Sequence, residues 1–107
     1  MAQETPALLL RIYLDEGDKY ESKPLYEALV LRARDYGLAG ATVLRGPLGF
    51  GSASEIHTAK ILRLSEHLPM VVEMVDSEEQ IRGFVEESAE LLHSALVTLE
   101  KVSRWQP

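Results

Sequence analysis

The sequence predicts an α+β fold of the ferredoxin-like βαββαβ type, a four-stranded antiparallel sheet with two helices on one face. Two segments carry apolar residues at the three- and four-residue spacing of amphipathic helices, and four segments have the pattern of strands. Their order is strand, helix, strand, strand, helix, strand. At 107 residues the chain has the length of a single domain, so we expect residues 1–107 to form one domain.

The N-terminal half supplies the first three elements. Residues 7–15 alternate leucine or isoleucine with other residues, which is typical of a strand. We expect the first helix to use Ser22 as its N-cap, to place Pro24 in its first turn and to end at Gly37. Residues 41–45 then form the second strand.

The C-terminal half begins with a glycine-rich loop over residues 46–67 and a third strand over residues 69–76. Ser77 with Gln80 has the spacing of a capping box and predicts the start of the second helix. Residues 95–103 form the fourth strand. The buried stripe predicted for the second helix contains Ile81, Phe84, Val85, Leu91 and Leu92.

One face of such a sheet has no helices. Each strand offers two alternating sets of side chains for that face, and both sets are rich in apolar residues. In the first strand the choice is between the set with Leu10 and the set with Arg11 and Tyr13. A monomer would expose a sizeable apolar patch in either case. We therefore expect a homo-oligomer whose open sheet faces pack together.

Composition narrows the function classes. The chain has no cysteine, which excludes disulfides, thiolate metal sites and a cysteine nucleophile. Its net charge of −6 disfavours nucleic-acid binding. The longest apolar run, residues 7–10, is far shorter than a membrane span, and the N-terminal residues lack a basic signal-peptide region. We expect a cytoplasmic protein without direct membrane insertion.

Several motifs resemble those of the nitrogen-regulatory PII proteins. They include Gly49-Phe50-Gly51 after the second strand and the return strand from Leu68 to Val75. Residues 20–28, 40–46, 56–65 and 96–102 are similar to an uncharacterised PII-like family, domain of unknown function 190. This resemblance covers nearly the whole chain. It implies a trimeric PII-like domain, a T-loop-like insertion at about 46–67, and a signalling rather than an enzymatic role.

The chain departs from PII proteins at three places. Ser52 and Ala53 stand where PII has arginine and glutamine, and the loop lacks the tyrosine that PII proteins nucleotidylate. The connection over residues 92–95 lacks the glycines and lysine of the PII phosphate-binding loop. These departures argue against a standard PII-type site for ATP and 2-oxoglutarate.

When the chain is divided into residues 1–40, 41–67 and 68–107, only the middle segment has more lysine and arginine than aspartate and glutamate, three against two. Glycines there allow backbone N–H groups to approach an anion, and serines and cations add donors and charge. We therefore predict a small anionic ligand, with an adenine nucleotide as the candidate effector, at inter-subunit clefts near this loop. The predicted binding residues are Arg45, Gly46, Gly49, Gly51, Ser52, Ser54, His57, Lys60 and Arg63.

Other functions remain open. The loop could instead dock on a partner protein, such as a transporter or an enzyme, without a ligand. A divalent-cation-handling role is the third alternative, but His57 and His67 match no standard metal spacing, so we predict no metal site. Ser52 or Ser54 with His57 lacks an evident buried acid, so we predict no catalytic residues.

Overall fold

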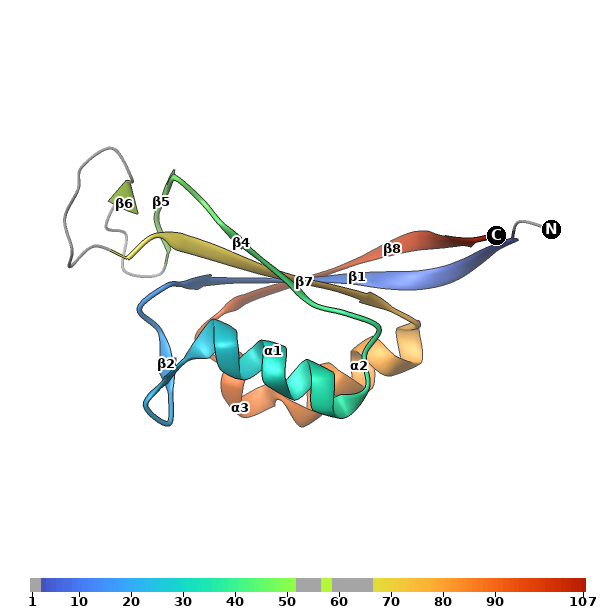
Figure 1. Ribbon diagram of the computed structural model, residues 1–107, viewed down its shortest axis with the longest axis horizontal. Coiled ribbons are helices and arrows are strands. Elements are labelled where there is room, and N and C mark those ends of the chain that lie inside the picture. Colours follow the sequence, from blue (N-terminus) through green and yellow to red (C-terminus); the bar gives the residue numbers. More distant parts are fainter. Residues whose placement is uncertain (1–2, 52–56, 59–66) are drawn as a thin grey trace.

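The computed structural model describes residues 3–51, 57–58 and 67–107. Its main sheet has four strands in the order β4-β7-β1-β8, all antiparallel to their neighbours. Figure 1 shows the helices packed on one side of this sheet and the opposite side open. The predicted fold class is therefore confirmed. The strands are β1 (Gln3–Asp15), β4 (Thr42–Arg45), β7 (Pro69–Asp76) and β8 (Leu96–Gln106).

The core lies between the sheet and the helices, because one alternating set of each central strand is apolar. In β1 the buried set is Leu8, Leu10, Ile12 and Leu14. The register pairs Leu10 with Met74 and Ile12 with Val72 of β7, so these side chains point to the same face. The residues of the other set, Arg11 and Tyr13 among them, lie on the open face. This decides which of the two sets faces the helices.

Helix α1 (Leu25–Tyr36) begins later than its predicted cap. Ser22 is not the N-cap, which is Pro24 without a side-chain cap hydrogen bond. Ser22 instead lies with Glu21 in the turn between β2 (Lys19–Tyr20) and β3 (Lys23–Pro24), and both turn residues have positive φ, 48° and 69°. The short hairpin uses the residues that the sequence assigned to the cap. The end of α1 at Gly37, with φ 98°, agrees with the prediction.

The second predicted helix is two helices, α2 (Glu78–Glu87) and α3 (Ala89–Leu92), which meet at Ser88. The Ser77 cap is confirmed, because its Oγ accepts a hydrogen bond from the Gln80 backbone N–H at 3.2 Å. Phe84 of α2 is fully buried and packs edge-to-face on the Tyr36 ring, with the two ring centroids 5.8 Å apart. This contact fastens α2 to α1.

Two strands are longer than predicted. β1 begins at Gln3 instead of residue 7, and β8 continues to Gln106 instead of residue 103. Their added ends pair with each other, from Gln3 opposite Gln106 to Thr5 opposite Arg104, and extend past the helices side by side (Figure 1). No helix in the described part of the chain is long and apolar enough to cross a membrane.

Candidate functional site

The glycine-rich segment leaves the sheet at the end of β4 and is anchored there by Pro69. The Gly46 N–H donates a hydrogen bond of 2.8 Å to the Pro69 carbonyl. Gly46 and Gly49 both lie against the Pro69 ring, because a Cβ atom at either position would come within 3.0–3.1 Å of its Cγ. The absence of side chains therefore lets β4 and β5 (Leu48–Gly49) pass close to the start of β7.

Arg45, the last residue of β4, makes an ion pair with Glu16. Its Nη2 lies 3.0 Å from Glu16 Oε1, and the same oxygen accepts the Leu68 N–H at 3.1 Å. Partial burial raises the pKa of Glu16, but the Leu68 N–H and the Arg45 guanidinium outweigh it and hold the pKa below its usual value. This carboxylate therefore ties β1, β4 and the residue before β7 together in its charged form.

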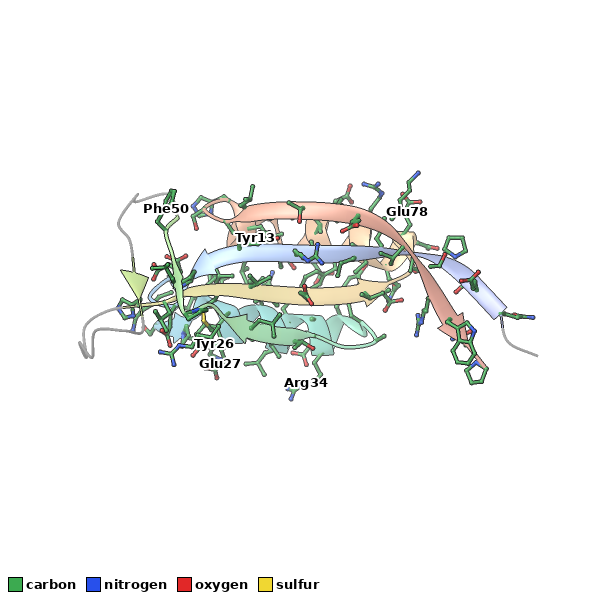
Figure 2. The ribbon with its side chains drawn as sticks, turned by 90° about the horizontal axis from the view of Figure 1, so that it is seen from above. Tyr13, Tyr26, Glu27, Arg34, Phe50 and Glu78 are labelled. Atoms are coloured by element: carbon green, nitrogen blue, oxygen red, sulfur yellow. The ribbon has the colours of Figure 1, made fainter. Side chains whose placement is uncertain are left out.

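A groove of about 290 Å³ lies beside this anchor, where the open face meets the end of β1. Figure 2 looks onto that face, with Phe50 just after β5 and Tyr13 on the sheet nearby. Tyr13 is 38% exposed and Phe50 is 66% exposed, so both rings offer surface to a ligand. The groove is lined by Tyr13, Leu14, Asp15, Asp18, Phe50, Gly51, Pro69, Met70, Val71 and Ser94.

Two carboxylates on the groove wall also order the turn after β1. Asp18 Oδ2 accepts the Asp15 N–H at 3.0 Å, and Asp15 Oδ1 accepts the Gly17 N–H at 2.7 Å. Carboxylate oxygens accept hydrogen bonds but donate none when ionised. The described wall therefore suits a ligand that presents hydroxyl or amino donors, while any positive charge must come from elsewhere.

The predicted site residues separate into four groups. Arg45, Gly46 and Gly49 form the anchor, and Gly51 lines the groove. His57 belongs to β6 (His57–Thr58), whose pairing with β5 sets it opposite Gly49 in the backbone register. The others lie outside the described residues: Ser52, Ser54, Lys60 and Arg63.

The sequence prediction did not include most of the groove. Tyr13, Asp15 and Asp18 come from the end of β1, and Ser94 from the connection before β8. Tyr13 could have been predicted from the sequence, because it alternates with Arg11 on the more polar side of the first strand and so lies on the open face. Nothing in the spacing of the other residues along the chain indicates that they meet.

Within residues 3–51, 57–58 and 67–107, no group of three or more histidine, aspartate or glutamate residues could hold a metal ion. Glu55 and Glu66, the carboxylates next to His57 and His67 in the sequence, lie outside these ranges.

The chain is similar in sequence to proteins of one family and similar in fold to several solved structures. Residues 7–104 match the DUF190 family, described as Uncharacterized ACR, COG1993. A UPF0166 protein of Aquifex aeolicus is 46% identical over 94 residues, which are 88% of this chain and 89% of that protein. The apo form of CPII, a nitrogen regulatory PII-like protein from Thiomonas intermedia K12, aligns over the full length of both chains with a TM-score of 0.67 and 16% identity.

A second solved form of that protein has a ligand. CPII bound to ADP, AMP and bicarbonate aligns over 98% of this chain and 99% of its own, with a TM-score of 0.67 and 18% identity. At such identities the likeness concerns the fold. The chain thus has a PII-like fold, as its motifs predict.

Proposed function

Because this chain belongs to the DUF190 family and has a PII-like fold, we propose that it is a non-enzymatic regulatory protein that binds a small anionic ligand at the base of segment 46–67. The observation that carries the proposal is the groove between Tyr13 and Phe50, which joins the open sheet face to the start of that segment. A ligand there contacts the sheet and the segment together, so binding can change how the segment meets a partner.

An adenine nucleotide fits the chemistry of this groove. A purine ring stacks on aromatic side chains such as Tyr13 and Phe50. Asp15 and Asp18 offer acceptors to ribose hydroxyls or to the adenine amino group. A solved protein of the same fold is described as bound to ADP, AMP and bicarbonate, which supports this choice of ligand class.

The phosphates need positive charge that the described wall does not supply. Arg45 is more than half exposed but already faces Glu16. In our proposal Lys60 and Arg63 of the loop, with a neighbouring subunit of a homotrimer, complete the site. Ser52, Ser54 and His57 add hydrogen-bond partners. The loop then acts as a T-loop-like segment of a single cytoplasmic domain and controls a transporter or an enzyme.

Isothermal titration of the purified protein with AMP, ADP, ATP and bicarbonate tests the ligand. We expect saturable binding of one adenine nucleotide, weakened about fivefold or more in Phe50→Ala, since a base–aromatic stack contributes roughly 1–3 kcal/mol. Leu48→Ala is the matched control, because Leu48 of β5 is similarly exposed but does not line the groove. Lys60→Ala and Arg63→Ala should weaken ADP more than adenosine. Absence of binding for every compound, or equal losses in Phe50→Ala and Leu48→Ala, would contradict the proposal.

Docking without a ligand is the second candidate, favoured by one observation. Leu48 and Phe50 are 61% and 66% exposed, so β5 and the residue after it present two large apolar side chains to solvent. In this case Leu48→Ala and Phe50→Ala should weaken partner binding alike, and no small molecule should alter it.

A further inference from the structure

A second groove, which we call the helix-side groove, lies on the side of the sheet that carries the helices. It has a volume of about 770 Å³, and three elements form it: the hairpin of β2 and β3, helix α1, and the end of α2 together with α3. Figure 1 shows these elements grouped below the sheet. Tyr13 and Phe50 belong to the other groove, and no described residue lines both. The helix-side groove is therefore a separate candidate site.

The wall of the helix-side groove already holds one guanidinium, that of Arg32. Its Nη1 donates to the Glu90 carboxylate and, at 3.3 Å, to the Glu87 backbone carbonyl. The guanidinium carbon lies 5.9 Å from the centroid of the Tyr20 ring, which is within cation–π range. A carboxylate, a carbonyl and an aromatic ring from three elements thus surround one arginine side chain, which is only 27% exposed.

The groove supplies the same kinds of group a second time. Beyond the groups that surround Arg32, its lining contains three carboxylates and a second aromatic ring: Glu21, Asp35, Glu87 and Tyr36. Lys23 is the one lining cation of the described wall apart from Arg32, whose charge Glu90 already balances. The described wall therefore has an excess of negative charge beside an aromatic ring.

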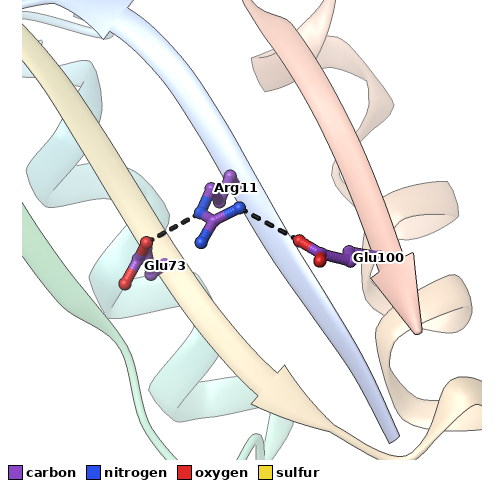
Figure 3. A network of polar contacts seen from close by, with 3 residues as sticks. All are labelled: Arg11, Glu73 and Glu100. Atoms are coloured by element: carbon purple, nitrogen blue, oxygen red, sulfur yellow. Dashed lines mark hydrogen bonds and ion pairs between the residues drawn. The ribbon is translucent and has the colours of Figure 1, made fainter. Parts of the chain in front are cut away.

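Two of these carboxylates have no partner in the part of the chain that the structure describes. Glu21 and Glu87 are exposed, and neither side chain makes a hydrogen bond or an ion pair with a described residue. On the open face of the sheet, by contrast, Arg11 binds both Glu73 and Glu100 (Figure 3). The helix-side groove therefore combines unpaired negative charge with a hollow in the surface.

These groups favour an organic cation as the occupant. An anion would face the excess of carboxylates. A metal ion does not fit either, because the described residues contain no group of three or more histidine, aspartate or glutamate side chains that could hold one. A guanidinium gains from both carboxylates and ring faces. The methylene groups that carry it can pack on the apolar lining residues Ala28, Leu31 and Leu91.

A peptide suits the groove better than a small amine. The free carboxylates are exposed, so a single ion pair with one of them contributes little. Several cations on one chain add their contributions, because each contact raises the local concentration of the next. We propose that the helix-side groove binds an arginine-rich peptide segment of a partner protein, whose side chains pair with Glu21 and Glu87. Arginine is preferred to lysine because its planar guanidinium stacks on aromatic rings, as Arg32 does on Tyr20. This inference goes beyond the proposed function and does not depend on its nucleotide.

Fluorescence anisotropy with a fluorescein-labelled tetra-arginine peptide tests the site. We expect saturable binding that weakens with added salt, weaker binding of tetra-lysine and none of tetra-glutamate. The double variant Glu21→Gln/Glu87→Gln should bind tetra-arginine about fivefold or more weakly, because two ion pairs are lost. Glu27→Gln/Glu79→Gln is the matched control, since it makes the same change in net charge at exposed positions of α1 and α2 that do not line the groove.

Absence of tetra-arginine binding would overturn the inference. Equal losses in the two double variants would also overturn it, because the net charge alone would then attract the peptide. Displacement of the peptide by an equal concentration of free arginine would identify a site for a small cation instead. Circular dichroism establishes that the variants are folded, and Glu87→Gln with Glu79→Gln as its control replaces the double variants if they are not. Phe50→Ala separates this site from the proposed ligand, since it should weaken the adenine nucleotide and leave tetra-arginine binding unchanged.

Discussion

The guanidinium of Arg45 lies 3.0 Å from the carboxylate of Glu16, which precedes it by 29 residues in the chain. Arg45 is one of the cations that the sequence assigns to an anionic ligand. In the folded protein the carboxylate of Glu16, the residue after β1, already partly neutralises its charge. Glu16 is therefore a structural clamp for the base of segment 46–67, and an anion that approaches Arg45 competes with it.

Replacing Glu16 with glutamine should lower the stability of the fold in a pH-dependent way. The pKa of Glu16 is lowered in the folded protein from its ordinary value of 4.5, so its charged form contributes stability that is fully present above that value. This contribution disappears as the pH falls through the lowered pKa. We expect Glu16→Gln to lower the free energy of unfolding by about 1 kcal/mol at pH 7 and to match the wild type near pH 2.

Urea unfolding of both proteins between pH 2 and pH 8 measures this difference. Glu27→Gln is the control, because this substitution removes the same charge from an exposed position on α1. A Glu16→Gln deficit that stays constant over the whole pH range would contradict the assignment.

The three glycines of the Gly46–Gly51 stretch should respond differently to alanine. At Gly46 and Gly49 a methyl group would press on the Pro69 ring, which cannot rotate away because it is closed onto the backbone. At Gly51 a methyl group would meet nothing within 4 Å. We expect Gly49→Ala to lower the free energy of unfolding by about 1 kcal/mol, and Gly51→Ala to leave it unchanged or raise it slightly. Thermal melts decide this, and a Gly51→Ala variant as unstable as Gly49→Ala would refute the argument.

Periodicity was enough to predict the main sheet and the position of α1 and α2, because alternation and three-to-four spacing report directly which side chains are buried. It could not predict the β2–β3 hairpin. Glu21 and Ser22 adopt positive φ without glycine or asparagine, and those are the residues by which such turns are recognised. Ser22 consequently looked like a helix cap.

Choosing the open face needed more than alternation, since both sets of β1 are rich in apolar residues. The signal was in the charges. Arg11 belongs to the alternating set of β1 that faces away from the core, and Glu73 to the corresponding set of β7. The pairing of β1 with β7 puts these two residues opposite each other. The groove was harder to predict, because Tyr13, Phe50 and Ser94 meet only through strand register and loop path.

The contact between α1 and α2 predicts that Gly83→Ala changes the free energy of unfolding in opposite directions in the wild type and in a Tyr36→Phe variant. A Cβ atom at Gly83 would overlap the Tyr36 hydroxyl, whereas the ring carbon behind it is at an ordinary 3.5 Å. Gly83→Ala should therefore destabilise the wild type by about 1 kcal/mol. In a Tyr36→Phe background the same change should stabilise the protein by up to about 1 kcal/mol, because alanine favours a helix interior over glycine. A double-mutant cycle from urea unfolding measures the coupling between the two substitutions. Additive effects would show that the Tyr36 hydroxyl does not limit how closely α1 and α2 pack.

Two serines at helix ends should have opposite effects when each is changed to alanine. Ser88 is fully buried where α2 meets α3, and its Oγ has no hydrogen-bond partner in the described chain. A buried hydroxyl without a partner is unfavourable, so Ser88→Ala should raise the free energy of unfolding by up to about 1 kcal/mol. Ser77 is exposed, but its Oγ accepts the Gln80 N–H, so Ser77→Ala should lower it by about 1 kcal/mol. Chemical denaturation of the two variants gives both signs directly. A loss of stability in Ser88→Ala would mean that its hydroxyl finds a partner at the junction, and that the break between α2 and α3 depends on it.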